Sequence, residues 1–331
     1  MTATTDFAPP RWLRGRHVQS ILSSSGLRRR AGARALTRLR AQHDEHLLDG
    51  GDGVRLHGIH SHLARPPRGL VLLLHGWEGS VQSGYMLHTA ATLLAAGFDV
   101  FRLNFRDHGD SHHLNVDPFH SCRIGEVVNA ARSLTQIIPT SPLLVAGFSL
   151  GGNFALRLAL HAPRAGIALA HAAAVCPVVD PAAGLRALET GPPLYHWYFM
   201  RKWRGSLRRK RALFPQRHDF DDAVLAQDMR ALTAWMVGRY TDMGALENYL
   251  DGYSIADERL AGLRVPVSIL AARDDPVIPI ADFHRLQLPA HSRLDVAAFG
   301  GHCGFLEGAA LRGYGERWIT ARLLAASAVP A

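Results

Sequence analysis

One short segment decides the fold of this 331-residue chain: Leu143-Leu-Val-Ala-Gly-Phe-Ser149-Leu-Gly-Gly-Asn153. It passes from an apolar, β-rich stretch through Gly147-Phe-Ser149-Leu-Gly151 into an Ala/Leu-rich stretch of helical composition. A serine between glycines at such a junction predicts a sharp strand-to-helix turn that lifts the side chain to the carboxyl end of the strand. We therefore predict a nucleophilic Ser149, with the N–H of Leu150 available to a developing oxyanion. A glycine-rich corner with an incidental serine is the less favoured interpretation.

Strand-like and helix-like stretches alternate on both sides of this segment. The β-rich runs are 70–74, 98–105, 143–148, 167–179, 265–271 and 294–299, and helical stretches lie at 86–96, 126–138, 153–161 and 311–327. Residues 47–56 add two short strands around a Gly/Asp turn. Such alternation is typical of crossover units on a parallel sheet. We predict an α/β fold with a mostly parallel, eight-stranded sheet flanked by helices.

The alternation stops between residues 181 and 261. A stretch of roughly eighty residues is too long for a loop without secondary structure, so we expect a helical cap insertion at 181–261. The two parts of the core are then 46–180 and 262–331. Residues 1–45 form a basic segment that we expect to pack on the core, with nine arginines from Arg11 to Arg40 and no acid among them.

A serine hydroxyl needs a base and an orienting acid, and later strand ends supply candidates for both. His302 follows the last strand-like run through Gly300-Gly301, and Asp274-Asp275 follows the run before it. The order serine, aspartate, histidine is that of the α/β-hydrolases. We predict a triad of Ser149, His302 and one of these two aspartates.

The turn after residues 70–74 is expected to supply the second oxyanion donor, the backbone N–H of Trp77. His75 in the same turn is expected to orient it. His75 is also a candidate substrate contact, as are Trp197 and Tyr198 in the cap. We interpret Arg106, Asp107, His108 and His120 as structural first.

These motifs, taken together and in order, resemble the α/β-hydrolases of the abhydrolase type, and within them the YheT-like branch of esterases. They are Pro9-Pro-Arg-Trp12-Leu-Arg-Gly-Arg-His17-Val-Gln19-Ser-Ile21, His75-Gly-Trp77-Glu-Gly-Ser80, Gly147-Phe-Ser149-Leu-Gly-Gly-Asn153, Asp274-Asp275-Pro276 and Gly300-Gly-His302. The resemblance implies hydrolysis of short- to medium-chain acyl esters, lipid-derived ones among them, without a cofactor. It favours Asp275 as the triad acid, because Asp275 stands four residues before Pro279. The chain departs from the branch at Arg106-Asp107, where relatives commonly have Arg-Gly.

The net charge of +9 favours an anionic partner or surface. Between Arg201 and Arg211, seven of eleven residues are basic, beside Trp197 and Tyr198. This segment is either a docking surface for an anionic membrane or a solvated helix face whose aromatics pack on the core, and we favour the second. Nothing resembles a fold that reads nucleic acid, so no specific nucleic-acid partner is expected.

The three cysteines are far apart and the histidines lack ligand-like spacing, so we expect no disulfide framework and no metal site. The sequence also lacks a basic and apolar leader and an apolar stretch long enough to span a bilayer. We expect a cytoplasmic protein, at most peripheral to the inner membrane surface. A serine esterase is the leading hypothesis. The alternatives are an acyltransferase or thioesterase that uses the same acyl-enzyme, and a non-catalytic, membrane-associated binding module.

Overall fold

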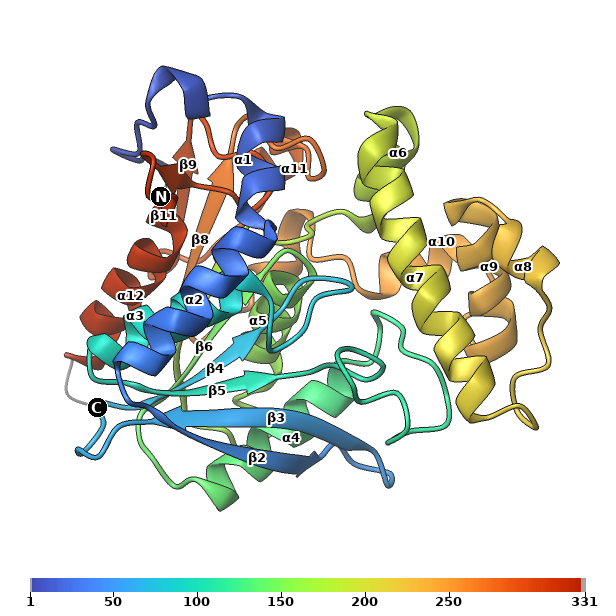
Figure 1. Ribbon diagram of the computed structural model, residues 1–331, viewed down its shortest axis with the longest axis horizontal. Helices are drawn as coiled ribbons and strands as arrows, with labels where there is room; N and C mark the ends of the chain where they lie inside the picture. Colours follow the sequence, from blue (N-terminus) through green and yellow to red (C-terminus); the bar gives the residue numbers. More distant parts are fainter. Residues whose placement is uncertain (1, 329–331) are drawn as a thin grey trace.

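A nine-stranded sheet forms the centre of the computed structural model, which describes residues 2–328 (Figure 1). The strand order is β1-β9-β8-β7-β6-β4-β5-β3-β2, and β10 pairs with β11 in a separate ribbon. The strands are β1 Thr2–Thr4, β2 Gln42–Asp49, β3 Arg55–His62, β4 Leu70–Leu74, β5 Asp99–Leu103, β6 Leu143–Phe148, β7 Leu169–Val175, β8 Val267–Ala272, β9 Arg293–Ala297, β10 Leu306–Glu307 and β11 Arg312–Gly313. From β1 to β5 in this order every pair is parallel, whereas β2 and β3 are antiparallel.

Helices cover both faces of the sheet and form the long insertion. They are α1 Arg16–Ser23, α2 Gly26–Arg38, α3 Gly84–Ala95, α4 Ile124–Ile137, α5 Leu150–His161, α6 Pro181–Thr190, α7 Pro193–Leu213, α8 Asp222–Ala226, α9 Met229–Tyr240, α10 Leu246–Gly252, α11 Ile280–His284 and α12 Tyr314–Ser327, with 3-10 turns at Arg11–Leu13 and Asp257–Leu260. The predicted mostly parallel α/β sheet with flanking helices is confirmed.

The sheet has one strand more than the eight we predicted. β1 adds to the edge beside β9, with Thr2 opposite Leu294 and Thr4 opposite Val296. A strand of three residues is too short for its sequence to show a pattern that predicts it.

The middle of the sheet is apolar on both faces. In β4, Leu70, Leu72 and Leu74 pack with α4 and α5, whereas Val71 and Leu73 face α3 and α12. All five residues of β4 are fully buried. This is the reason the parallel strands read as continuous apolar runs in the sequence.

Helices α6 to α10 occupy the inserted stretch and lie together on one side of the sheet (Figure 1). They share an apolar cluster of their own, which includes Met200, Trp203, Leu207, Leu232 and Met236. The inner part of this cluster also meets Trp77, in the loop after β4. The insertion therefore packs against the carboxyl edge of the sheet.

Candidate active site

Ser149 lies at the sharp turn between β6 and α5, with φ 52° and ψ −120°. A non-glycine residue in this region is strained, and the surrounding packing holds it there. A Cβ at Gly147 would stand 2.1 Å from the carbonyl oxygen of Gly151, and one at Gly151 would stand 2.3 Å from that of Leu74. The two glycines flanking Ser149 are therefore required by the close approach of strand and helix.

The structure brings Ser149, His302 and Asp275 into one hydrogen-bonded chain. The Ser149 hydroxyl donates to Nε2 of His302 over 2.9 Å, and Nδ1 of His302 donates to Oδ2 of Asp275 over 2.9 Å. The Asp275 carboxylate is fixed in turn by the backbone N–H groups of Val277 and Ile278, at 2.8 and 3.0 Å. This is the geometry in which a histidine can take a serine proton.

The charge of Asp275 decides the basicity of His302. Burial of the ring lowers its pKa, but the neighbouring Asp275 carboxylate, together with the Cys303 thiol, outweighs burial and raises the pKa of His302 to about 9. An imidazolium formed during a reaction would be stabilised by the same carboxylate.

Asp274 and Ser20 hold the loop that carries His302. Oδ1 of Asp274 accepts the backbone N–H of Gly301 over 2.9 Å, and Oγ of Ser20, on α1, accepts the N–H of His302 over 2.8 Å. Asp274 therefore contacts the histidine loop, while Asp275 contacts the ring. Ser20 could not be predicted, because nothing in the local sequence links it to a residue 282 positions away.

The backbone N–H groups of Trp77 and Leu150 both lie beside Ser149, where oxyanion donors were predicted. Within residues 2–328 neither donates to a protein acceptor. The preceding N–H, of Gly76, donates to the Tyr85 hydroxyl over 2.9 Å, which fixes the turn.

A cavity of about 130 Å³, partly open to solvent, leads from Ser149 into the insertion. Its apolar walls include Leu185, Leu188, Phe199, Trp203, Leu207, Met229, Met236 and Leu250. Glu78, Asp107 and His108 line its polar end. An apolar lining with a few polar groups is typical of a site for an apolar small molecule.

None of the three predicted substrate contacts, His75, Trp197 and Tyr198, lines this cavity. His75 is fully buried, donates from Nδ1 to the carbonyl of Gly76 and accepts the N–H of Phe105 at Nε2. It orients the turn, as expected of it.

Trp197 and Tyr198 are 58% and 38% exposed, on the outer face of α7. Phe199 and Trp203, four residues apart on the inner face, line the cavity instead. The sequence identified the aromatic segment, but not which face of the helix turns inward.

Two carboxyl groups at the polar end have perturbed acidity. Burial raises the pKa of Glu78 to about 8, although Lys202 opposes the shift. Burial raises the pKa of Asp107 to about 6, against the pull of Lys210. Both residues have positive φ, 56° and 59°. A positive φ at position 107 is consistent with the glycine that members of the YheT-like branch commonly have there, because glycine adopts this conformation without strain.

The basic run on α7 is divided between interior and surface. Lys210 is buried against Asp107, and Arg211 pairs with Asp222. Arg201, Lys202 and Arg208 remain exposed. Part of the positive charge therefore fastens the insertion to the core and is not available to a partner.

A serine, histidine and aspartate aligned at the carboxyl edge of a mostly parallel sheet, beneath a helical insertion, define an α/β-hydrolase. The chain belongs to the hydrolase family described as serine aminopeptidase, S33, whose family model matches residues 65–305. The YheT-like branch stays a prediction.

Among curated proteins, the chain is similar to phospholipase ABHD3. It is 26% identical to the mouse protein (Mus musculus) and 24% identical to the human protein (Homo sapiens), each over 256 residues. Each match covers 73% of this chain, and the chain spans only 59% of the length of these relatives.

Solved structures share the fold. The Pyrococcus furiosus esterase Pf2001 superposes with a TM-score of 0.57 at 15% identity, covering 88% of this chain and 91% of that one. The carboxylesterase CesB of Bacillus subtilis gives 0.55 at 17% identity, covering 92% and 99%. These likenesses confirm the predicted α/β-hydrolase fold.

Proposed function

We propose that this protein is a serine carboxylic ester hydrolase that acts on short- to medium-chain acyl esters, with lipid-derived esters among its substrates. One observation carries the proposal: Ser149, which is hydrogen-bonded through His302 to Asp275 with 2.9 Å at each step, lines a cavity with mainly apolar walls. The family membership supports hydrolysis as the reaction type.

In the proposed mechanism, Ser149 attacks the acyl carbonyl while His302 takes its proton. The N–H groups of Trp77 and Leu150 stabilise the oxyanion of the tetrahedral intermediate. His302 then donates the proton to the leaving alcohol. Water, activated by the same imidazole, hydrolyses the acyl-enzyme and restores the serine.

The two ends of the cavity suggest where each half of the substrate lies. The acyl chain fits the apolar walls formed by Leu185, Met229, Met236 and Leu250, since those walls offer no hydrogen-bonding partners. The alcohol half fits the part lined by Glu78 and Asp107, whose carboxyl groups offer hydrogen-bonding partners. The name of the ABHD3 relatives, phospholipase, supports a lipid among the esters.

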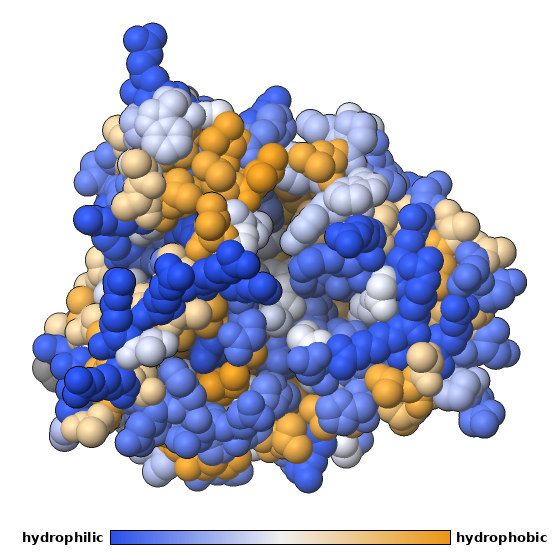
Figure 2. All heavy atoms as spheres, viewed as in Figure 1, coloured by the Kyte–Doolittle hydropathy of each residue, from blue (hydrophilic) through white to orange (hydrophobic). Residues whose placement is uncertain are grey.

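An anionic membrane surface is the partner we propose for delivery of such a lipid. Exposed apolar side chains gather over α1, beside a hollow that separates α1 from the side of α6 and α7 (Figure 2). They are Trp12, Val18, Ile21 and Leu27 on one side and Leu194, Trp197 and Tyr198 on the other. A 2.9 Å hydrogen bond between His17 and Tyr195 joins the two sides.

Exposed cations, including Arg16, Arg29, Arg30, Arg201 and Lys202, stand beside this apolar surface. Apolar groups ringed by arginines suit a bilayer with anionic lipids. Within residues 2–328, no helix is both long and apolar enough to cross a membrane.

The chemical proposal is tested by labelling with a fluorophosphonate probe and by turnover of p-nitrophenyl esters from acetate to palmitate. Ser149→Ala should lose labelling, and its turnover should fall by at least about 10⁴. Ser133→Ala, on α4 outside the cavity, is the matched control and should behave as wild type. Ester turnover that survives in Ser149→Ala would refute the proposal. An added alcohol that captured most of the acyl group would instead favour acyl transfer.

The membrane proposal is tested by sedimentation with vesicles of phosphatidylglycerol and phosphatidylcholine. Ile21→Ala with Trp197→Ala should bind more weakly than wild type. Leu47→Ala, an exposed apolar residue on β2, is the control. Equal binding by all three proteins would remove the docking surface from the proposal.

A further inference from the structure

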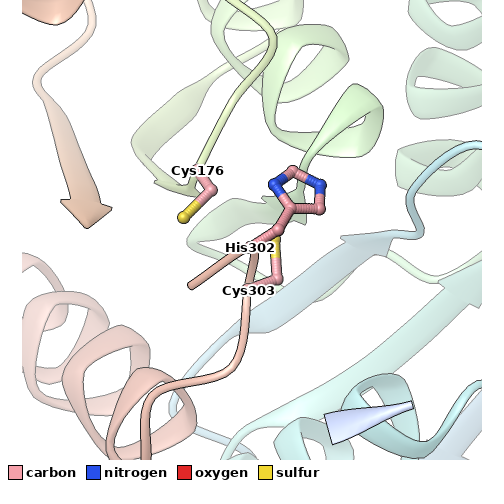
Figure 3. Close-up of side chains that lie close together, drawn as sticks. All are labelled: Cys176, His302 and Cys303. Carbon is pink, nitrogen blue, oxygen red and sulfur yellow. The ribbon is translucent and has the colours of Figure 1, made fainter. Parts of the chain in front are cut away.

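Two cysteines lie against His302 from different parts of the chain (Figure 3). Cys176 directly follows the last residue of β7, and Cys303 directly follows His302 on the loop after β9. The two sulfur atoms and one ring nitrogen all lie within 4.8 Å of one another. The sequence did not predict this cluster, because Cys176 and Cys303 are far apart in the chain and come close only because β7 and β9 end at the same edge of the sheet.

Among the residues that the structure describes, neither thiol has a partner in a disulfide or a short hydrogen bond. Both are free cysteines, and their contacts are long: the Cys176 thiol lies 3.9 Å from the carbonyl oxygen of Gly301, and the Cys303 thiol lies 3.6 Å from that of Val175. Such weak contacts lose little when a stronger ligand bond forms. Cys303 and His302 are partly exposed, whereas Cys176 is fully buried.

Two sulfurs and one imidazole nitrogen form a donor set suited to thiophilic divalent ions, above all Zn²⁺. Zinc bonds of about 2.3 Å to sulfur and about 2.0 Å to nitrogen place tetrahedral ligands about 3.5 Å apart. Since the three atoms already lie within 4.8 Å of one another, they would have to approach by at most about 1.3 Å, a movement that rotamer changes of the two cysteine side chains can supply. Three protein ligands leave the fourth position for water.

We propose that Cys176, His302 and Cys303 form a binding site for a thiophilic divalent metal ion, and that the bound ion switches the hydrolase off. Both ring nitrogens already hold triad partners, Asp275 at Nδ1 and Ser149 at Nε2. Whichever nitrogen binds the ion, one of these hydrogen bonds is lost. Binding releases the two thiol protons and changes no oxidation state.

Metal binding is tested first without reference to activity, by titration with Co²⁺ under a non-thiol reductant. Wild type should develop the near-ultraviolet absorption of a thiolate bonded to Co²⁺. Cys122→Ser is the matched control, since Cys122 is the third free cysteine and lies outside the cluster. It should give the same band, and Cys176→Ser with Cys303→Ser should give none. A wild type without the band, or a double variant that keeps it, would refute the site.

Inhibition is tested with buffered free Zn²⁺, and this half of the inference rests on the proposed function. Turnover of a p-nitrophenyl ester by wild type and Cys122→Ser should fall at the same Zn²⁺ concentration and recover with EDTA. The double variant should require at least about tenfold more Zn²⁺. Equal midpoints in all three proteins would mean that the cysteines take no part.

Two further controls separate the possible failures. Cys303→Ala alone serves if the double variant does not fold, because Cys303 is only partly buried. Should wild type hydrolyse no ester at all, the proposed function fails while the Co²⁺ titration still decides the metal site.

Discussion

Replacement of Lys210 by methionine is expected to destabilise the protein by about 3–5 kcal/mol, the range for breaking a buried ion pair by removing one partner. Nζ of Lys210 lies 2.5 Å from Oδ1 of Asp107, with the two side chains only 1% and 5% exposed. It also donates to the carbonyl oxygens of His112 and Asn115, at 2.9 and 2.6 Å. Methionine fills similar space but leaves a buried carboxylate without its cation, and both carbonyls without this donor.

The loss should depend on pH, because Asp107 can be protonated. Burial already raises the pKa of Asp107 to about 6, and without Lys210 this pKa rises further. At pH 8 the variant must bury an unpaired charge. At pH 5.5 it can bury a neutral carboxyl instead, so the destabilisation should be smaller at the lower pH.

Urea unfolding followed by circular dichroism at both pH values measures these differences. Arg209→Met is the matched control. Arg209, the neighbour of Lys210, is 44% exposed and pairs with Asp110, which is 98% exposed, so the variant should lose no more than about 1 kcal/mol of stability. Asp107→Asn in the Lys210→Met background should recover part of the stability. Equal losses of stability in the two single variants, or a loss in Lys210→Met that is the same at pH 5.5 and pH 8, would show that the buried charge of Asp107 does not govern the effect.

Three further predictions concern the candidate site. Since the base must be neutral and the pKa of His302 is raised to about 9, kcat/KM should rise from pH 6 towards pH 9. Asp275→Asn should shift this rise to lower pH, because the neighbouring carboxylate that most raises the pKa of His302 is then gone, and should reduce kcat by about 10⁴; an unshifted profile would contradict the role of Asp275. Asp274→Ala removes the acceptor of the Gly301 N–H and should lower kcat about 5- to 30-fold with little change in KM, whereas Asp110→Ala should change neither. Met236→Trp narrows the apolar cavity, so the preferred p-nitrophenyl ester should become shorter while fluorophosphonate labelling persists; an unchanged preference would mean that the acyl chain lies elsewhere.

Features that depend on neighbouring residues or on strand order could be predicted from the sequence, whereas features that depend on long-range packing could not. The turn at Ser149 is encoded by its own neighbours, because glycines 147 and 151 are demanded by contacts within a few residues and with β4. His302 and Asp275 could be placed because parallel strands end at one edge of the sheet, so residues after those strands meet. These positions follow from topology, which the alternation of strands and helices indicates.

Other features could not be predicted, for the opposite reason. The inner face of α7 depends on how the insertion packs, so the sequence favoured Trp197 and Tyr198 where the cavity has Phe199 and Trp203. The pairing of Lys210 with Asp107 likewise joins segments about a hundred residues apart. No sequence pattern predicts contacts between segments so far apart in the chain.

The hydrogen bond from the His302 N–H to Ser20 has a consequence for biosynthesis. The α1 residue Ser20 leaves the ribosome 282 residues before His302, whose loop it holds. The same holds for Gln19, whose side-chain oxygen accepts the backbone N–H of Leu306, a residue synthesised long after it. A ribosome stalled before residue 302 therefore carries a chain with the serine turn already made and no means to activate it. Hydrolytic competence on the nascent chain should therefore appear only after residues 302–306 have left the ribosome.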